Sequence, residues 1–145
     1  LTDNAGDFFV NLSIAYVDDE RRSDTPGDPY VTIMEQERRL RSRSYLSFSW
    51  TKNDWAAGVS TSRIGSMNYQ SPRWDGRPNT KIDPYYDIGA FVRYDIEDGH
   101  YVALSVSNLM DDIPKKNSDL GWPWFARYYY SPVGRELFLT YRYTF

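Results

Sequence analysis

Residues 8–16 read FFVNLSIAY, with large apolar side chains at every second position: Phe8, Val10, Leu12, Ile14 and Tyr16. Successive side chains of a β-strand point to opposite faces of a sheet, so this alternation predicts a strand with one apolar face. Residues 86–96, YDIGAFVRYDI, repeat the pattern, and their charged residues fall on the opposite parity. Together these stretches indicate an all-β fold.

The same alternation recurs along the whole chain, whereas no segment repeats its apolar residues at the spacing of a helix. It predicts an antiparallel meander of about six long strands near residues 8–17, 39–51, 55–64, 85–96, 100–110 and 134–145. Tight turns at 52–54 and 97–99 alternate with long loops near 18–38, 66–84 and 111–133. Long strands joined alternately by short turns and long loops are typical of outer-membrane β-barrels.

Composition excludes several classes of function. The chain has 145 residues, no cysteine, one histidine and a net charge of -3. Cysteine chemistry and a histidine zinc cluster are therefore excluded, and the acidic balance argues against nucleic acid as a partner. No apolar run approaches the roughly 20 residues of a membrane helix. This does not exclude membrane-spanning strands, because they alternate apolar and polar residues and contain no long apolar run.

No motif predicts catalysis. The chain has no nucleophile elbow, phosphate loop or dinucleotide fingerprint, and His100 is expected to be a surface turn residue. Asp111-Asp112 and Asp18-Asp19-Glu20 offer oxygens to calcium, although solvated loop carboxylates are the favoured interpretation. We therefore predict no enzyme, no catalytic residue, no metal site and no cofactor.

The apolar parity of these strands is predicted to face lipid. The alternating apolar positions of the six segments include no Asp, Glu, Lys or Arg. Their aromatic residues fall at strand ends, with Phe8, Trp50, Trp55, Tyr94, Tyr143 and Phe145 on the turn side and Tyr16 and Tyr86 on the loop side. Such belts match the two interfaces of a bilayer. The alternative is a soluble sheet with a dry core face.

Two C-terminal segments resemble a known family. Residues 102–112, VALSVSNLMDD, resemble the penultimate strand of TonB-dependent outer-membrane receptors, which ends in an Asn-Leu-hydrophobic-Asp motif. Residues 131–145, SPVGRELFLTYRYTF, resemble the closing strand of the same family, with Gly134, Tyr141, Tyr143 and the terminal Phe145 as its barrel-assembly signal. One departure is Met110, where an aromatic residue is more common.

The resemblance implies that residues 1–145 are the C-terminal segment of a larger transmembrane β-barrel, and no plug domain is expected in this chain. It further implies a transporter in the outer membrane of a Gram-negative bacterium. Extracellular loops capture a scarce ligand, such as an iron chelator, and TonB supplies energy through the plug. The implied partners are the bilayer and its lipopolysaccharide, the rest of the barrel and plug, TonB, and the outer-membrane assembly machinery.

Candidate ligand-binding residues lie in the second and third long loops. They are aromatic or cationic, a combination that suits sugars, aromatic chelators or anions: Tyr69, Arg73, Trp74, Arg77, Trp122, Trp124, Phe125, Arg127 and Tyr128. The alternatives for the third-loop residues are that they pack the loops together above the barrel or begin the last strand. Arg39, Arg41 and Arg43 share the non-lipid parity and are predicted to face the lumen. Their favoured partner is an intramolecular carboxylate; a plug carboxylate, an anionic substrate or lipopolysaccharide phosphates are the others.

Two other functions remain open at this point. One is a passive outer-membrane channel or adhesin barrel without a plug. The other is a soluble or surface all-β carbohydrate-binding module that uses Trp74, Trp122 and Trp124. The identity of a transported ligand is not legible in the sequence.

Overall fold

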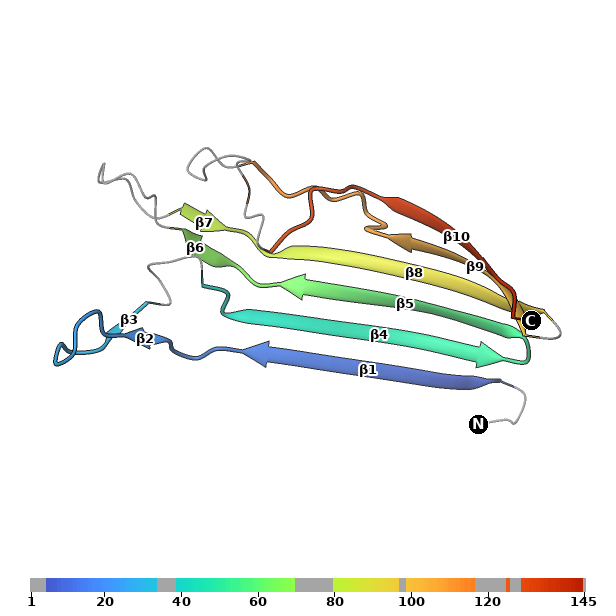
Figure 1. Cartoon of the computed structure of the whole chain (residues 1–145), viewed down its shortest axis with the longest axis horizontal. Coiled ribbons are helices and arrows are strands. Elements are labelled where there is room, and N and C mark those ends of the chain that lie inside the picture. The colour runs from blue at the N-terminus through green and yellow to red at the C-terminus, as the bar shows by residue number, and fades with distance from the viewer. Residues whose placement is uncertain are drawn as a thin grey trace.

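The computed structural model describes residues 5–33, 39–69, 80–96, 99–116, 125 and 129–144. These residues form an all-β structure without a helix, as the sequence predicts. One antiparallel sheet contains the six long strands β1 (Asp7–Tyr16), β4 (Ser42–Lys52), β5 (Trp55–Ile64), β8 (Tyr85–Ile96), β9 (His100–Ser107) and β10 (Glu136–Arg142) (Figure 1). Each pairs with the next of these strands along the chain, so the sheet is a meander.

Two short hairpins lie within the predicted loops. β2 (Arg21–Arg22) pairs with β3 (Val31–Thr32), and β6 (Met67–Tyr69) pairs with β7 (Thr80–Ile82). The sequence analysis does not anticipate them, because strands of two or three residues are too short to show a period of two. Both hairpins extend from the same end of the sheet, at the left of Figure 1.

Some strands are shorter than the sequence suggests. β9 ends at Ser107 rather than near residue 110, because Asn108 and Asp111 adopt left-handed backbone angles with φ of 48° and 56°. Left-handed residues cannot continue a strand. β10 covers 136–142 rather than 134–145, and β4 begins at Ser42 rather than at residue 39.

The register places the two side-chain parities on opposite faces of the sheet. Phe8 lies opposite Trp50, Val59 opposite Ala90, and Leu104 opposite Leu139. We call the side with these residues the apolar face. The other side, which we call the polar face, includes Ser47 opposite Ser60.

The short turns and the long loops lie at opposite ends of the sheet. Asn53 and Asp54 join β4 to β5, and a second tight turn that includes Gly99 joins β8 to β9. The β4–β5 turn and the adjoining ends of β8 and β9 lie at the right of Figure 1, whereas the hairpins β2–β3 and β6–β7 lie at the left. We call these the turn end and the loop end.

The sheet is a single layer and encloses little core. Among the described residues, the buried hydrophobic side chains are Ile33, Met67 and Tyr130, and none of them belongs to the six long strands. The accessible surface is 10973 Å², whereas a folded monomer of this size exposes about 7,700 Å². The outer edges of β1 and β10 have no paired strand within the described residues. Within the described residues, most of both faces and both outer edges of this sheet are therefore uncovered.

Gly58 is required where β5 passes under Phe91 of β8. A β-carbon at Gly58 would lie 2.5 Å from Phe91 Cε1 and 3.0 Å from the carbonyl oxygen of Phe48. We expect Gly58→Ala to lower the free energy of unfolding by about 1–3 kcal/mol, because the ring can move but the backbone carbonyl cannot. Denaturant unfolding of the protein measures this change.

Gly89→Ala is the matched control, because a β-carbon there would approach its neighbours no closer than 3.3 Å. Its effect should be clearly smaller. Combining Gly58→Ala with Phe91→Leu should recover little of the loss, because the contact with the Phe48 carbonyl oxygen remains. Equal effects of the two alanine substitutions would contradict this account of the packing at Gly58.

Candidate functional site

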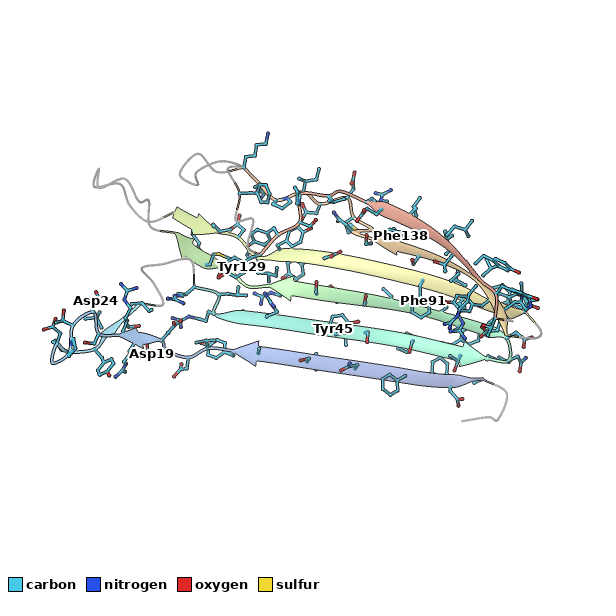
Figure 2. All side chains as sticks on the ribbon, viewed as in Figure 1. Asp19, Asp24, Tyr45, Phe91, Tyr129 and Phe138 are labelled. Atoms are coloured by element: carbon cyan, nitrogen blue, oxygen red, sulfur yellow. The ribbon has the colours of Figure 1, made fainter. Side chains whose placement is uncertain are left out.

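The apolar face is the largest candidate surface of the described chain. Each of the six long strands has exposed large side chains on this face, with exposed fractions from 38% for Val92 to 77% for Leu139. Figure 2 shows side chains projecting from the sheet with no second layer covering them. Soluble monomers rarely expose an apolar patch larger than a few hundred Å². A surface of this kind needs a partner that is itself apolar.

Aromatic side chains in contact form a band along the turn end of the apolar face. The rings of Trp55 and Tyr94 have centroids 4.7 Å apart, and those of His100 and Tyr143 are 4.2 Å apart. His100 Nδ1 lies 3.0 Å from the hydroxyl oxygen of Tyr141. His100 therefore lies beside a turn, where the sequence predicts it, and also contacts aromatic rings, which the sequence does not predict. Rings with polar tips are the side chains that favour a membrane interface.

The loop end of the apolar face carries an arginine that the sequence analysis does not count. β5 continues to Ile64, so Arg63 has the same parity as Trp55 and Val59. At the turn end, Lys52 has the parity of Trp50. The apolar parity is therefore free of charge only over its central rows, and cations stand at its two rims.

The polar face is hollowed into an open groove lined largely by small side chains. Serine hydroxyls from β4, β5 and β9 dominate it: Ser47, Ser49, Ser60, Ser62, Ser105 and Ser107. Tyr45 and Phe91 contribute rings, and Asp87 contributes a carboxylate. This lining is rich in hydroxyl groups and includes the carboxylate of Asp87, whereas the opposite face carries large apolar side chains.

A network of hydrogen bonds at the loop end, which we call the loop-base network, centres on Asn108. Its side chain donates from Nδ2 to the carbonyl oxygens of Asp112 (2.8 Å) and Val133 (3.3 Å), and its Oδ1 accepts from the Asp112 amide (3.0 Å). Its own amide donates to Asp87 Oδ1 at 3.1 Å. Asn108 is only 4% exposed. It thus fastens both ends of the third loop to β8.

Asp111 adds a second tie between the same loop ends. Its Oδ1 accepts a hydrogen bond from the Arg135 amide at 2.8 Å, and a β-carbon on Gly134 would lie 2.6 Å from that oxygen. The Asn108–Asp112 motif and the Gly134-Arg135 pair, noted in the sequence for their resemblance, are therefore in direct contact. Their contact joins the two ends of the third loop, a structural role that the sequence alone does not reveal.

A small hydrophobic cluster fills the space beneath the loops. Met67 and Tyr130 are buried, and Leu40, Ile64, Ile82, Tyr85, Phe125 and Tyr129 pack against them. Tyr85 and Tyr130 meet edge to face with ring centroids 5.1 Å apart. Burial raises the pKa of the Tyr130 hydroxyl, and negative charge from Tyr129 and Asp83 adds to the effect. Phe125 is one of the predicted ligand-binding residues, and in the structure it packs against this cluster.

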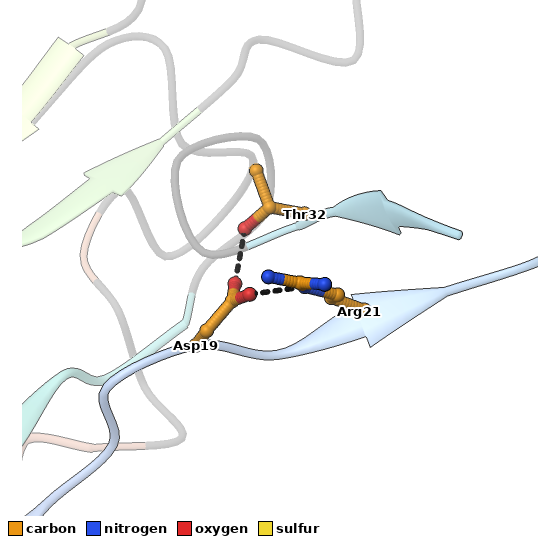
Figure 3. A network of polar contacts seen from close by, with 3 residues as sticks. All are labelled: Asp19, Arg21 and Thr32. Atoms are coloured by element: carbon orange, nitrogen blue, oxygen red, sulfur yellow. Dashed lines mark hydrogen bonds and ion pairs between the residues drawn. The ribbon is translucent and has the colours of Figure 1, made fainter. Parts of the chain in front are cut away.

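The first loop is stiffened by charge pairs around the β2–β3 hairpin (Figure 3). Asp19 accepts hydrogen bonds from the Thr32 hydroxyl at 2.6 Å and from the Arg21 guanidinium. The Thr32 bond, followed by the Arg21 bond, lowers the pKa of Asp19 below its ordinary value. Glu20 pairs with Arg39 at 3.0 Å. Asp19 and Glu20 are thus paired with nearby arginines.

The predicted lumen residues occupy different settings. Arg39 and Arg41 precede β4, and Arg39 has the intramolecular partner Glu20. Arg43 lies in β4 on the polar face, opposite Ala15 and Ile64.

Most predicted ligand-binding residues lie outside the described residues: Arg73, Trp74, Arg77, Trp122, Trp124, Arg127 and Tyr128. The side chain of Tyr69 and the terminal Phe145 also lie outside them.

Within the described ranges, no three His, Cys, Asp or Glu side chains gather in a way that could hold a metal ion. No helix in the described part of the chain is long and apolar enough to cross a membrane. Comparisons with protein-family models, curated proteins and solved structures find no match to this chain.

Proposed function

We propose that this chain is the C-terminal β-barrel segment of a TonB-dependent transporter in the outer membrane of a Gram-negative bacterium. The transporter captures a scarce small nutrient with its extracellular loops and imports it with energy relayed by TonB to a plug. The segment contributes lipid contact, part of the loop surface and the closing strands of the barrel.

The observation that carries the proposal is the single-layer sheet with one exposed apolar face and one serine-rich face. Val10, Leu12 and Ile14 on the edge strand are 61%, 62% and 67% exposed. Lipid tails would cover such a face without requiring polar groups from it, and a hydrated or protein-filled lumen suits the opposite face. The uncovered edges of β1 and β10 suit strands continued by the rest of a barrel, because closure is how barrels remove edges.

Strand length agrees with the same proposal. β1 and β5 each contain 10 residues, which span about 33 Å at roughly 3.3 Å per residue. A tilt of about 40° reduces that length to a height of about 25 Å, the height of the apolar band in outer-membrane barrels. The resemblance of residues 102–112 and 131–145 to TonB-dependent receptors favours that family over other outer-membrane barrels.

Cysteine labelling in intact cells tests the topology. The chain has no cysteine of its own, so Asp28→Cys in the first loop and Asp54→Cys in a tight turn introduce defined thiols. In cells that express the full-length protein, a membrane-impermeant maleimide should label residue 28 directly. It should label residue 54 only after the outer membrane is made permeable. Equal labelling of both positions before that step would contradict the proposal.

Conductance separates a plugged transporter from a passive channel. The purified full-length protein in a planar bilayer should pass almost no ions, because a plug closes the lumen. A steady open conductance would favour the passive channel instead, and a protein that stays monomeric without detergent would favour the soluble module.

A further inference from the structure

Arg63 is an unusual cation because of where it stands. It lies on the apolar face, one row from the loop end of the sheet, between Ser44 of β4 and Tyr86 of β8. The row nearer the middle of the sheet is uncharged and consists of Leu46, Thr61 and Ile88. Arg63 therefore marks the level at which the apolar band ends.

Neutral hydroxyl groups hold the guanidinium in place. Arg63 Nε donates to the hydroxyl oxygen of Tyr86 at 3.2 Å, and Nη1 donates to Ser42 Oγ at 3.1 Å. The guanidinium carbon also lies 5.9 Å from the centre of the Tyr86 ring. These contacts orient the group, and among the described residues none of them brings a negative charge to it.

Two other arginines of the described chain pair with carboxylates. Arg93 forms paired hydrogen bonds of 2.8 Å with Asp95, and Arg39 pairs with Glu20. Within the described ranges, no carboxylate pairs with Arg63, and its Nη2 has no acceptor. An oriented guanidinium with unused donors matches the oxygens of a phosphate, which it can bind through two parallel hydrogen bonds.

We propose that Arg63, with Tyr86 and Ser42, binds the phosphate of an anionic lipid headgroup at the loop-end rim of the apolar face. This inference rests on the proposed function, because it requires lipid to cover that face. The aliphatic stem of Arg63 then lies along the apolar band while its charged end reaches the headgroup level. The Tyr86 hydroxyl, which accepts from Nε, still has its own proton to donate to the phosphate.

The test compares lipid selectivity of the full-length protein in two kinds of vesicle, phosphatidylcholine alone and phosphatidylcholine with added phosphatidylglycerol. Spin-labelled versions of both lipids report which one associates with the protein surface. The wild type should prefer phosphatidylglycerol, and Arg63→Gln should reduce that preference about five-fold, which corresponds to roughly 1 kcal/mol for one cation near an anionic lipid surface.

Arg43→Gln is the matched control. The substitution removes the same charge at nearly the same level of the sheet, but Arg43 lies on the polar face. It should leave the preference unchanged. Tyr86→Phe is a second variant, because it keeps the ring but removes the hydroxyl that orients Nε; it should weaken the preference less than Arg63→Gln does. If Arg63→Gln does not fold, Tyr86→Phe decides the question alone.

The outcomes separate the two proposals. A protein that fails to insert even into phosphatidylcholine overturns the proposed function. A protein that inserts but shows no preference, or an equal loss in Arg63→Gln and Arg43→Gln, overturns only the lipid site. Inorganic phosphate added at constant ionic strength should not abolish the preference; if it does, the site takes free phosphate, and the lipid headgroup is the wrong ligand.

Discussion

Leu139→Arg should cost about 2–4 kcal/mol of stability in the bilayer and strongly reduce the amount of folded protein in the outer membrane. Leu139 is the most exposed large side chain of β10, at 77%, and lies opposite Leu104 on the apolar face. In the proposed barrel, where lipid covers this face, an arginine there must carry its charge into the hydrocarbon or distort the lipid around it. Fractionation and heat-dependent electrophoretic migration of the full-length protein measure the folded amount.

Thr140→Arg is the control for this substitution. Thr140 is the next residue of the same strand, is also exposed, and lies opposite Ala103 on the polar face. Its replacement should change stability by no more than about 0.5 kcal/mol, as is usual for exposed polar positions. If arginine is tolerated equally at 139 and 140, then lipid does not cover the apolar face. Leu139→Ala separates the effect of charge from that of lost size.

Most of the sheet could be predicted from the sequence, because its physical cause is local. The alternation through Phe8, Val10 and Leu12 is legible without any tertiary contact, and the same is true of β8. The antiparallel pairing of neighbouring strands follows from the short turns. The hairpins β2–β3 and β6–β7 were not predictable, since their pairing depends on a few backbone hydrogen bonds and on side-chain contacts such as Thr32 with Asp19.

The candidate site was less legible than the sheet. Arg63 does not stand out in the sequence, because the alternation weakens after Thr61 although the predicted strand extends to residue 64. The partners of Arg63 come from two other strands, at Ser42 and Tyr86, and only the register brings them together. The motif that begins at Asn108 can be recognised in the sequence by its resemblance to a family motif. Its hydrogen bonds cannot be predicted in this way, because they join residues far apart in the chain.

Asn108→Ala is expected to release the base of the third loop and to lower stability by roughly 2–4 kcal/mol. The substitution leaves the Asp112 amide and the Asp112 and Val133 carbonyl oxygens without their side-chain partner, and a buried group that loses its hydrogen bond costs about 1–3 kcal/mol. Alanine is also less tolerant than asparagine of the left-handed φ of 48° found at this position. Amide hydrogen exchange of residues 109–116 and 131–135 should accelerate most, with a smaller change in β1 and β4.

Two further variants separate the causes of this loss. Asn108→Gly accepts the backbone angle but lacks the side chain, so its cost measures the hydrogen bonds, and the extra cost of alanine measures the backbone conformation. Asn108→Asp keeps the Oδ1 acceptor for the Asp112 amide but sets a carboxylate against two carbonyl oxygens, so we expect it to be at least as harmful as glycine. If all three variants exchange as slowly as the wild type at the loop base, the loop is held by the cluster around Met67 and Tyr130, and Asn108 does not fasten it.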